Sequence, residues 1–383
     1  MHDKKRIFVI GTVGVPACYG GFESLADNLL DYTPDNVEYT VFCSEKNYEQ
    51  KLDSYKGAEL FYIDRNANGK DSVLYDFECM KIAVREKADV ILILGVSGCV
   101  FLPLVRRVFK GKIIVNIDGL EWKREKWGLF AKAFLHFSER QAVRYADVII
   151  GDNKGITDYI YSSYKNAAAK KEVALIAYGG DNAFCEEDDS LFEKYPFCKN
   201  PYAVTVCRIE PENNVHLILE AFANLEKSVP AHPVSSACMA AELSSAALII
   251  VGNWETSKYG RMLKENYGSR KNIHLLDPVY EEHEINWLRS HSAIYVHGHS
   301  AGGTNPSLVE AMTLGLPVLA FDCVYNRATT EGEALYWKSA ADLSLFLKNT
   351  GAADLKELSK KMEDVAKENY TWQKIAAKYN SLY

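Results

Sequence analysis

The most informative segment of the sequence is Ala301-Gly-Gly-Thr-Asn-Pro-Ser-Leu-Val-Glu-Ala-Met-Thr-Leu-Gly-Leu-Pro-Val318. Within it, Asn305 is a typical helix N-cap, Pro306 suits the first helical position and Gly315 suits the helix end. The preceding Gly-Gly loop can bring backbone N–H groups close to an anion, and the helix dipole also favours negative charge there. Because capping alone does not demand Gly-Gly-Thr-Asn, the pattern favours an anion-binding loop over an ordinary capped helix.

A carboxylate follows within the first turns of this predicted helix. Glu310 can accept hydrogen bonds from both hydroxyls of a ribose, which indicates a nucleotide at the loop. The alternative is a surface glutamate on a purely structural helix. The residues predicted to bind the nucleotide in this segment are Gly302, Gly303, Thr304, Asn305, Ser307 and Glu310.

Outward from this segment, short apolar runs alternate with helical patterns along the whole chain. In the first half, the run Ile7 to Ile10 is typical of a buried strand, and Phe22 to Leu30 has helical spacing. The alternation stops near Gly179 and restarts with Tyr202 to Val206. Strands alternating with helices predict parallel sheets covered on both faces, so the sequence predicts an α/β protein of two Rossmann-like halves.

Composition narrows the class of protein. The chain has 383 residues, of which 48% are hydrophobic and 25% charged, as in globular proteins with ordinary cores. Nine cysteines form no C-x-x-C pair, which favours free thiols over a zinc ribbon or a disulfide scaffold. The net charge of −7 does not favour a nucleic-acid partner. Lys4-Lys-Arg6 before the apolar run Ile7 to Val15 leaves a cleaved signal as an alternative, but a buried first strand is favoured because two glycines interrupt the run.

Four motifs together resemble a known family. The segment Ser307 to Val318 looks like the nucleotide-sugar motif of family-four retaining glycosyltransferases, which have the GT-B fold. The segment Val206-Cys-Arg-Ile-Glu-Pro-Glu-Asn-Asn214, followed by Leu217-Ile-Leu-Glu-Ala-Phe222, is similar to the second motif of that family. Gly11-Thr-Val-Gly-Val-Pro-Ala-Cys-Tyr-Gly-Gly-Phe-Glu23 and Asp118-Gly-Leu-Glu-Trp-Lys-Arg124 resemble the polysaccharide-biosynthesis branch that includes rhamnosyltransferases.

The resemblance implies a division of the chain, with a cleft between two Rossmann-like domains. The implied parts are an acceptor-binding domain at 1–182, a linker at 183–200, a nucleotide-sugar-binding domain at 201–362, and a C-terminal helix at 363–383 that crosses back to the first domain.

The resemblance also implies roles for residues. Arg208 would contact the donor diphosphate, Glu310 the ribose, and Gly20 and Gly21 would let the first loop approach the phosphates. Two positions depart from the family pattern: Gly302 replaces a glutamate and Asn213 replaces a lysine. Transfer with retention is expected on one face of the sugar, with a leaving phosphate oxygen accepting the proton, so that no strong protein base is needed.

The implied reaction is transfer of L-rhamnose from dTDP-rhamnose onto a polyprenyl-diphosphate-linked saccharide, for a capsule, an O-antigen or a similar glycan. The alternatives are a transferase that uses a UDP-hexose and a non-catalytic nucleotide-sugar-binding partner in a glycan-assembly complex. A nicotinamide enzyme is disfavoured because the glycines between Gly11 and Gly21 do not fit G-x-G-x-x-G.

Polar residues after predicted strands of the first half suggest an acceptor site. Asp118 follows the strand Ile113 to Ile117, and strand carboxyl ends face the binding crevice in open α/β sheets. Asp152 follows the strand Val148 to Ile150 and Tyr178 precedes Gly179, so both are expected beside the same crevice. Asp118, Asp152 and Tyr178 are therefore candidate catalytic residues together with Arg208. The alternative for Asp118 is a structural role in a plain turn and a helix N-cap. The candidate acceptor-binding residues are Glu121, Trp122, Lys123 and Arg124.

No metal cofactor is predicted. His297 and His299 point the same way from a strand end, but no further ligand completes a tetrahedral set in the sequence, so a hydrogen-bonding or structural role is expected.

One segment is locally basic. From Val100 to Tyr145 there are ten Lys or Arg against four Asp or Glu, interleaved with aromatic residues. Basic side chains attract anionic headgroups and aromatic rings settle at the water–lipid boundary, so a membrane-facing patch is expected. The alternative is a set of buried helix positions for Phe130, Phe134 and Phe137. The predicted location is the cytoplasm, with peripheral association with the inner face of the plasma membrane.

Overall fold

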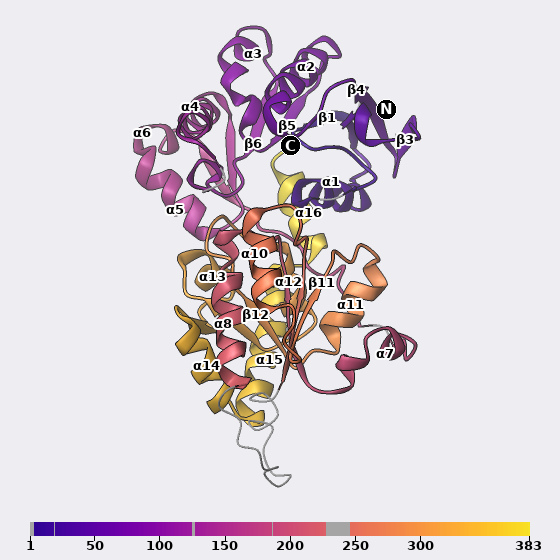
Figure 1. Cartoon of the computed structure of the whole chain (residues 1–383). Coiled ribbons are helices and arrows are strands. Elements are labelled where there is room, and N and C mark those ends of the chain that lie inside the picture. Colours follow the sequence, from indigo (N-terminus) through magenta and orange to yellow (C-terminus); the bar gives the residue numbers. More distant parts are fainter. Residues whose placement is uncertain (1–3, 19, 125–126, 186, 227–245) are drawn as a thin grey trace. The chain divides into compact units, whose positions relative to one another are not determined.

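The computed structural model describes residues 4–18, 20–124, 127–185, 187–226 and 246–383. The chain divides into two compact units, which are described separately (Figure 1). Unit 1 comprises residues 1–178 and 372–383, and unit 2 comprises residues 179–371. Both are α/β with parallel sheets, which confirms the predicted fold class.

The described part of unit 1 contains an eight-stranded sheet in the order β3-β4-β2-β1-β5-β6-β7-β8. Only the edge strand β3 is antiparallel to its neighbour. Ile7 to Ile10 of β1 are buried, because β1 lies between β2 and β5 in the middle of the sheet. The strands are β1 (Lys5–Ile10), β2 (Val37–Ser44), β3 (Ser54–Tyr55), β4 (Ala58–Ile63), β5 (Val90–Leu94), β6 (Lys112–Asn116), β7 (Val148–Gly151) and β8 (Glu172–Leu175).

The helices of unit 1 follow the strands as in other parallel sheets. They are α1 (Gly21–Asp31), α2 (Ser72–Arg85), α3 (Leu102–Val108), α4 (Leu129–Tyr145), α5 (Lys154–Ser163), α6 (Lys165–Ala168) and α16 (Trp372–Ser381), with short 3₁₀ turns η1 (Glu45–Asn47), η2 (Gly69–Asp71), η3 (Ser97–Phe101) and η4 (Glu121–Lys123). The last helix, α16, packs against α1 although the two lie at opposite ends of the sequence (Figure 1).

The described part of unit 2 contains a six-stranded parallel sheet in the order β11-β10-β9-β12-β13-β14. Its strands are β9 (Tyr202–Val206), β10 (Ala247–Val251), β11 (Ile273–Leu276), β12 (Ile294–His297), β13 (Val318–Phe321) and β14 (Leu335–Trp337). Its helices are α7 (Leu191–Lys194), α8 (Val215–Glu226), α10 (Lys258–Tyr267), α11 (Glu282–Ser290), α12 (Pro306–Thr313), α13 (Val324–Thr329), α14 (Ala340–Asn349) and α15 (Ala352–Asn369), with 3₁₀ turns η5 (Pro196–Lys199) and η6 (Pro211–Asn213).

The segment expected as a linker, 183–200, carries α7 and η5 and belongs to unit 2. It packs there because Phe192 stacks edge-on against buried Trp287, and the Tyr195 hydroxyl donates to Glu284. The expected C-terminal helix is in fact two helices, and only the second, α16, groups with unit 1.

Candidate active site

The loops after β9 and β12 flank the switch point of the unit 2 sheet. From β9 the chain leads to β10 on one side, whereas β12 lies on the other side, and ligands of open α/β sheets bind at such points. The two loops touch each other: the backbone N–H of Ser300 donates to the Glu212 carbonyl over 2.9 Å. A side chain on Gly298 would come within 2.1 Å of the Asn213 carbonyl oxygen, so glycine is required there.

The start of α12 has the predicted cap. The Asn305 side-chain oxygen accepts from the Ser307 N–H over 3.0 Å, and Pro306 occupies the first turn. Gly302, in the preceding loop, has a φ of 103°, a conformation that glycine adopts without strain. The loop and the cap therefore leave the N-terminal end of α12 suited to an anion.

Glu310 is held by an arginine that sequence reasoning did not assign to the site. Arg289 Nη2 of α11 lies 2.6 Å from Glu310 Oε2, and the two side chains are 6% and 17% exposed. Both groups are thus largely removed from water, and their pairing offsets part of the cost of burying them. One carboxylate oxygen of Glu310 is committed to Arg289, and the pair fixes the direction of the other.

Arg208 differs from Arg289 because its side chain is exposed, and no hydrogen bond or ion pair of its guanidinium occurs among the described residues. Its backbone carbonyl accepts from Asn213 Nδ2 over 2.6 Å. The other amide atom, Asn213 Oδ1, lies 2.6 Å from His299 Nδ1, which must therefore carry the proton. Asn213 is 4% exposed. It fixes the loop that presents Arg208 and does not replace the lysine of the family pattern as a cation.

In unit 1, the loop after β1 is held by Glu23 of α1. The Glu23 Oε1 atom accepts from the Thr12 hydroxyl over 3.0 Å and from the Val13 N–H over 2.7 Å. A side chain on Gly20 would come within 2.0 Å of Glu23 Oε2, and the φ of Gly20 is 142°. Gly20 is thus glycine because Glu23 occupies the space beside it.

Three of the predicted residues of unit 1 lie near one another. Tyr178 is buried, and its pKa is raised well above the ordinary value by burial and then by the charges of Asp118, Asp152 and Glu23. Asp118 follows β6 with a φ of 59°, and its N–H donates to Asn116 Oδ1 over 3.0 Å. Asp152 follows β7 and is 3% exposed. Tyr178 therefore stays protonated and neutral near these three acids.

Each half of the chain matches the model of a known protein family. A model described as "Glycosyl transferases group 1" matches residues 187–369, and a model of a domain of unknown function, DUF1972, matches residues 4–181. The second half of the chain thus matches the group 1 glycosyltransferases. This is the retaining family GT4, whose GT-B enzymes use nucleotide-sugar donors without a metal.

One curated relative is also described as a glycosyltransferase. A protein of Methanocaldococcus jannaschii described as "Uncharacterized glycosyltransferase MJ1059" is 22% identical over 276 residues, which are 67% of this chain and 63% of the relative. The match thus covers less than two thirds of that relative's length.

Solved structures share the fold. Sucrose-phosphate synthase from Thermosynechococcus elongatus matches with a TM-score of 0.76 at 14% identity, over 99% of this chain and 98% of that chain. Anabaena HepE in complex with UDP-glucose matches with a TM-score of 0.71 at 14% identity, over 99% of both chains. At such identities these matches establish the GT-B fold alone.

The two histidines at the end of β12, His297 within the strand and His299 after it, have different surroundings. His297 is 4% exposed, its ring stacks near Tyr295, and burial lowers its pKa to about 3. It therefore stays neutral, whereas His299 is bonded to Asn213. Among the described residues, no three His, Cys, Asp or Glu side chains are grouped so that they could hold a metal ion.

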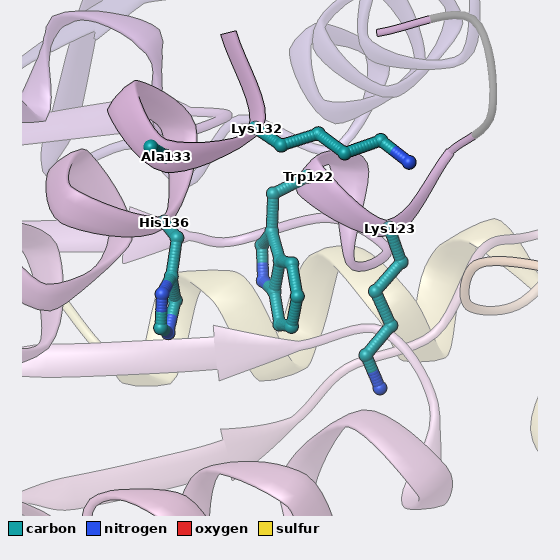
Figure 2. A pocket seen from close by; sticks show the side chains of 5 residues that line it. All are labelled: Trp122, Lys123, Lys132, Ala133 and His136. Atoms are coloured by element: carbon teal, nitrogen blue, oxygen red, sulfur yellow. The ribbon is translucent and has the colours of Figure 1, made fainter. Parts of the chain in front are cut away.

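The four candidate acceptor residues separate into two pairs. Glu121 and Arg124 bind each other, with 2.8 Å between Oε2 and Nε. Trp122 and Lys123 instead line a hollow with Lys132, Ala133 and His136 of α4 (Figure 2). Trp122 is fixed from behind, because its Nε1 donates to Glu139 Oε2 over 3.0 Å.

The basic segment of the glycosyltransferase is divided between core and surface. Phe130 is 96% exposed and Leu129 85%, whereas Leu135 is buried. The alternative of a buried helix stripe therefore does not hold for Phe130, which lies in the first turn of α4. Lys126, which belongs to the same segment, lies outside the described residues.

Arg289, Glu23 and Glu139 were missed as site residues. Glu23 ends the motif Gly11 to Glu23, so its place two residues after Gly21 was the available signal. Arg289 and Glu139 lie in helices of mixed composition, and no sequence pattern marks them as buried. No helix in the described part of the chain combines the length and the apolar character that crossing a membrane requires.

Proposed function

We propose that the protein transfers a sugar, with retention, from a nucleotide diphosphate to a polyprenyl-diphosphate-linked saccharide in cell-surface polysaccharide biosynthesis. Unit 2 binds the donor and unit 1 the acceptor. The observation that carries the proposal is the carboxylate of Glu310 on α12, the helix that follows the Gly-Gly loop, held by the buried Arg289 of α11. A carboxylate so fixed can accept the hydroxyls of a ribose while the diphosphate meets the start of the helix.

In this proposal, the departing diphosphate is stabilised by Arg208 and by the N–H groups at the start of α12. Both are present before the reaction, so their charge needs no rearrangement as the leaving group develops. The bond between the anomeric carbon and the diphosphate oxygen breaks, and a bond to the acceptor oxygen forms on the same face. The acceptor proton passes to a phosphate oxygen of the leaving nucleotide.

Asp118, Asp152 and Tyr178 of unit 1 orient the acceptor hydroxyl. The shared surroundings of these side chains support this role, because Tyr178 can donate while the carboxylates accept. Gly20 and Gly21 let the loop after β1 approach the donor phosphates, and Glu23 keeps that loop in place.

The donor that we propose is dTDP-rhamnose, from the motifs shared with the rhamnosyltransferase branch. A UDP-hexose is the second candidate, because the similar HepE structures of Anabaena hold UDP and UDP-glucose. Gly302 stands where the family pattern has a glutamate, so in this proposal backbone groups contact the sugar at that position.

A lipid-linked acceptor places the reaction at a membrane surface. We propose that the protein works in the cytoplasm, peripherally associated with the inner face of the plasma membrane. The exposed side chains of Leu129 and Phe130, which neighbour Lys123 and Lys132 in a locally basic segment, support this location.

The test is mass spectrometry of a polyprenyl-diphosphate-linked monosaccharide after incubation with the protein and single nucleotide sugars. A gain of one deoxyhexose from dTDP-rhamnose is expected. A gain of one hexose from a UDP-hexose keeps the reaction class and replaces the donor. No gain with any donor, despite nucleotide binding, contradicts the proposed reaction with this acceptor.

A further inference from the structure

An open hollow lies between η4 and the first turns of α4. Its volume is about 520 Å³. In Figure 2 the indole of Trp122 stands between His136 and Lys123, and Lys132 extends past it from α4. The rings of Trp122 and His136 have their centres 4.6 Å apart. Three side chains that can donate to an anion, those of Lys123, Lys132 and His136, thus line the hollow together with the indole.

The aromatic face is fixed by a buried carboxylate. Glu139 is 1% exposed and accepts from Trp122 Nε1 over 3.0 Å, from the Tyr159 hydroxyl over 2.7 Å and from the Tyr164 hydroxyl over 2.6 Å. Burial, and then the bond to Glu139, raises the pKa of Tyr159 to about 12, so this donor keeps its proton. Three neutral donors therefore stabilise Glu139, and the orientation of Trp122 is set before any ligand arrives.

The lysines of the hollow keep their charge available. Lys123 Nζ lies 5.4 Å from the centre of the Trp122 ring and 5.3 Å from that of Tyr159, and neither Lys123 nor Lys132 pairs with a carboxylate within the described residues. Of the described carboxylates nearby, Glu121 is paired with Arg124, and Glu139 accepts from its three donors. Within the described part of the chain, the positive charges of Lys123 and Lys132 therefore have no carboxylate partner.

An apolar surface continues the same helix face. Leu129, Lys132, Ala133 and His136 follow the spacing of side chains that share one side of a helix. Leu129 is 85% exposed at the end of this row, and its neighbour Phe130 is 96% exposed. Such apolar side chains beside a cationic hollow match a ligand that joins an anionic head to a hydrocarbon chain.

We infer that this hollow binds the diphosphate of the lipid-linked acceptor, with Lys123, Lys132 and His136 on the phosphates and Leu129 and Phe130 on the first isoprene units. The inference rests on the proposed acceptor class and adds the place where its diphosphate is recognised. The shared chemistry is a phosphate on an apolar chain, which an anionic phospholipid also offers.

A second hollow of unit 1 provides a matched control. It has a volume of about 610 Å³ and is lined by Lys110, but it has no indole, and its Arg106 is paired with Asp147. Arg107 and Lys110 are exposed and can be replaced together with the same loss of charge as Lys123 and Lys132.

The experiment measures binding of farnesyl diphosphate, farnesol and inorganic pyrophosphate by calorimetry in the absence of membranes. The wild-type protein is expected to bind farnesyl diphosphate more tightly than it binds farnesol or inorganic pyrophosphate. The variant with Lys123→Ala and Lys132→Ala is expected to bind it at least about tenfold more weakly, as loss of one or two charge-assisted bonds predicts. The variant with Arg107→Ala and Lys110→Ala is expected to stay within about twofold of wild type.

Equal weakening in the two double variants, or none in the Lys123 and Lys132 variant, overturns the inference. Binding to phosphatidylglycerol vesicles that depends on Lys123 and Lys132, without binding of farnesyl diphosphate, assigns the hollow to a phospholipid headgroup and also overturns it. UDP and dTDP binding, measured on the same variants, should be unchanged and reports that the protein is folded. Failure of sugar transfer with intact, lysine-dependent farnesyl diphosphate binding would count against the proposed reaction but not against this site.

Discussion

The two units stabilise their buried carboxylates in different ways. In unit 2, Glu310 is paired with the cation of Arg289. In unit 1, Glu23 and Glu139 are bound by neutral N–H and O–H donors instead. A carboxylate with one oxygen on a cation can turn its other oxygen to a ligand, whereas one whose oxygens accept from several neutral donors mainly fixes the positions of those donors.

Substitutions at the buried carboxylates of the two units should therefore have different effects. Changes near Glu310 in unit 2 should act on nucleotide binding and on turnover, because charge there faces the proposed donor. Changes at the buried acids of unit 1 should act first on stability, on its pH dependence, and on the order of the loop and the indole that those acids hold.

The largest expected effect is that of Arg208→Ala in unit 2. Arg208 is exposed and has no acidic partner among the described residues, so its charge is available for the leaving diphosphate. Loss of one such stabilising group should lower kcat about 10²–10³-fold. Steady-state rates of sugar transfer measure it, with the melting temperature expected to be unchanged. The exposed Arg261 of α10 gives the control Arg261→Ala. If both arginine variants keep wild-type turnover, Arg208 has no role in the reaction.

The second effect tests the ion pair itself. Arg289→Ala leaves the carboxylate of Glu310 with its cation removed, which should lower the free energy of unfolding by about 3 kcal/mol. Glu310→Gln keeps an acceptor for Arg289, so it should cost less stability. Both variants should bind nucleoside diphosphates more weakly. Denaturant unfolding and calorimetric titration with UDP or dTDP measure the two quantities. A loss of stability without a loss of affinity would make the pair structural only.

The same contrast shows what the sequence could and could not predict. The cap of α12, the strands β9 to β12 and the alternation of both units were predictable, because each depends on neighbouring residues. The strands β3, β4, β8 and β14 were not predicted, and three of them, β3, β8 and β14, are short, lie at sheet edges and are only partly buried. Local apolar periodicity is weak where a strand has one open side.

Within the site, the sequence supplied the residues but not their pairing. Glu310 was predicted to bind ribose, and its environment depends on Arg289 from another helix. Asn213 was noted as a departure from the family pattern, but its bonds to the Arg208 carbonyl and to His299 follow only from the touching loops. Contacts between elements are set by the packing of the sheet and its helices, which no local pattern encodes.

The third effect concerns a buried acid of unit 1 with too few donors. Asp76 of α2 is 3% exposed, its Oδ2 accepts from the Gly98 N–H over 2.9 Å, and its Oδ1 has no hydrogen-bond partner among the described residues. Burial raises the pKa of Asp76 to about 8. The folded protein therefore binds one proton more than the unfolded chain between about pH 4 and pH 8, so stability should fall as pH rises through this window.

The expected fall is about 2 kcal/mol between about pH 6.0 and pH 7.5, at 1.36 kcal/mol for each pKa unit. Asp76→Asn removes the titrating proton at nearly constant shape and should flatten this part of the profile. Urea unfolding of both proteins at several pH values measures the difference. Parallel pH profiles for wild type and variant would show that Asp76 is charged at neutral pH.

The smallest expected effect is that of Glu139→Gln. The carboxylate of Glu139 accepts from three donors, and an amide offers one oxygen and a nitrogen that cannot accept. At least one donor then lacks its partner, which should lower the free energy of unfolding by about 1–2 kcal/mol. Because Trp122 is one of these donors, farnesyl diphosphate binding should weaken by a few fold even though Glu139 does not line the hollow. A binding change equal to that of the double lysine variant would mean that Glu139 acts through the fold of unit 1 rather than through Trp122, whereas a loss of stability with unchanged binding would separate the indole from the ligand.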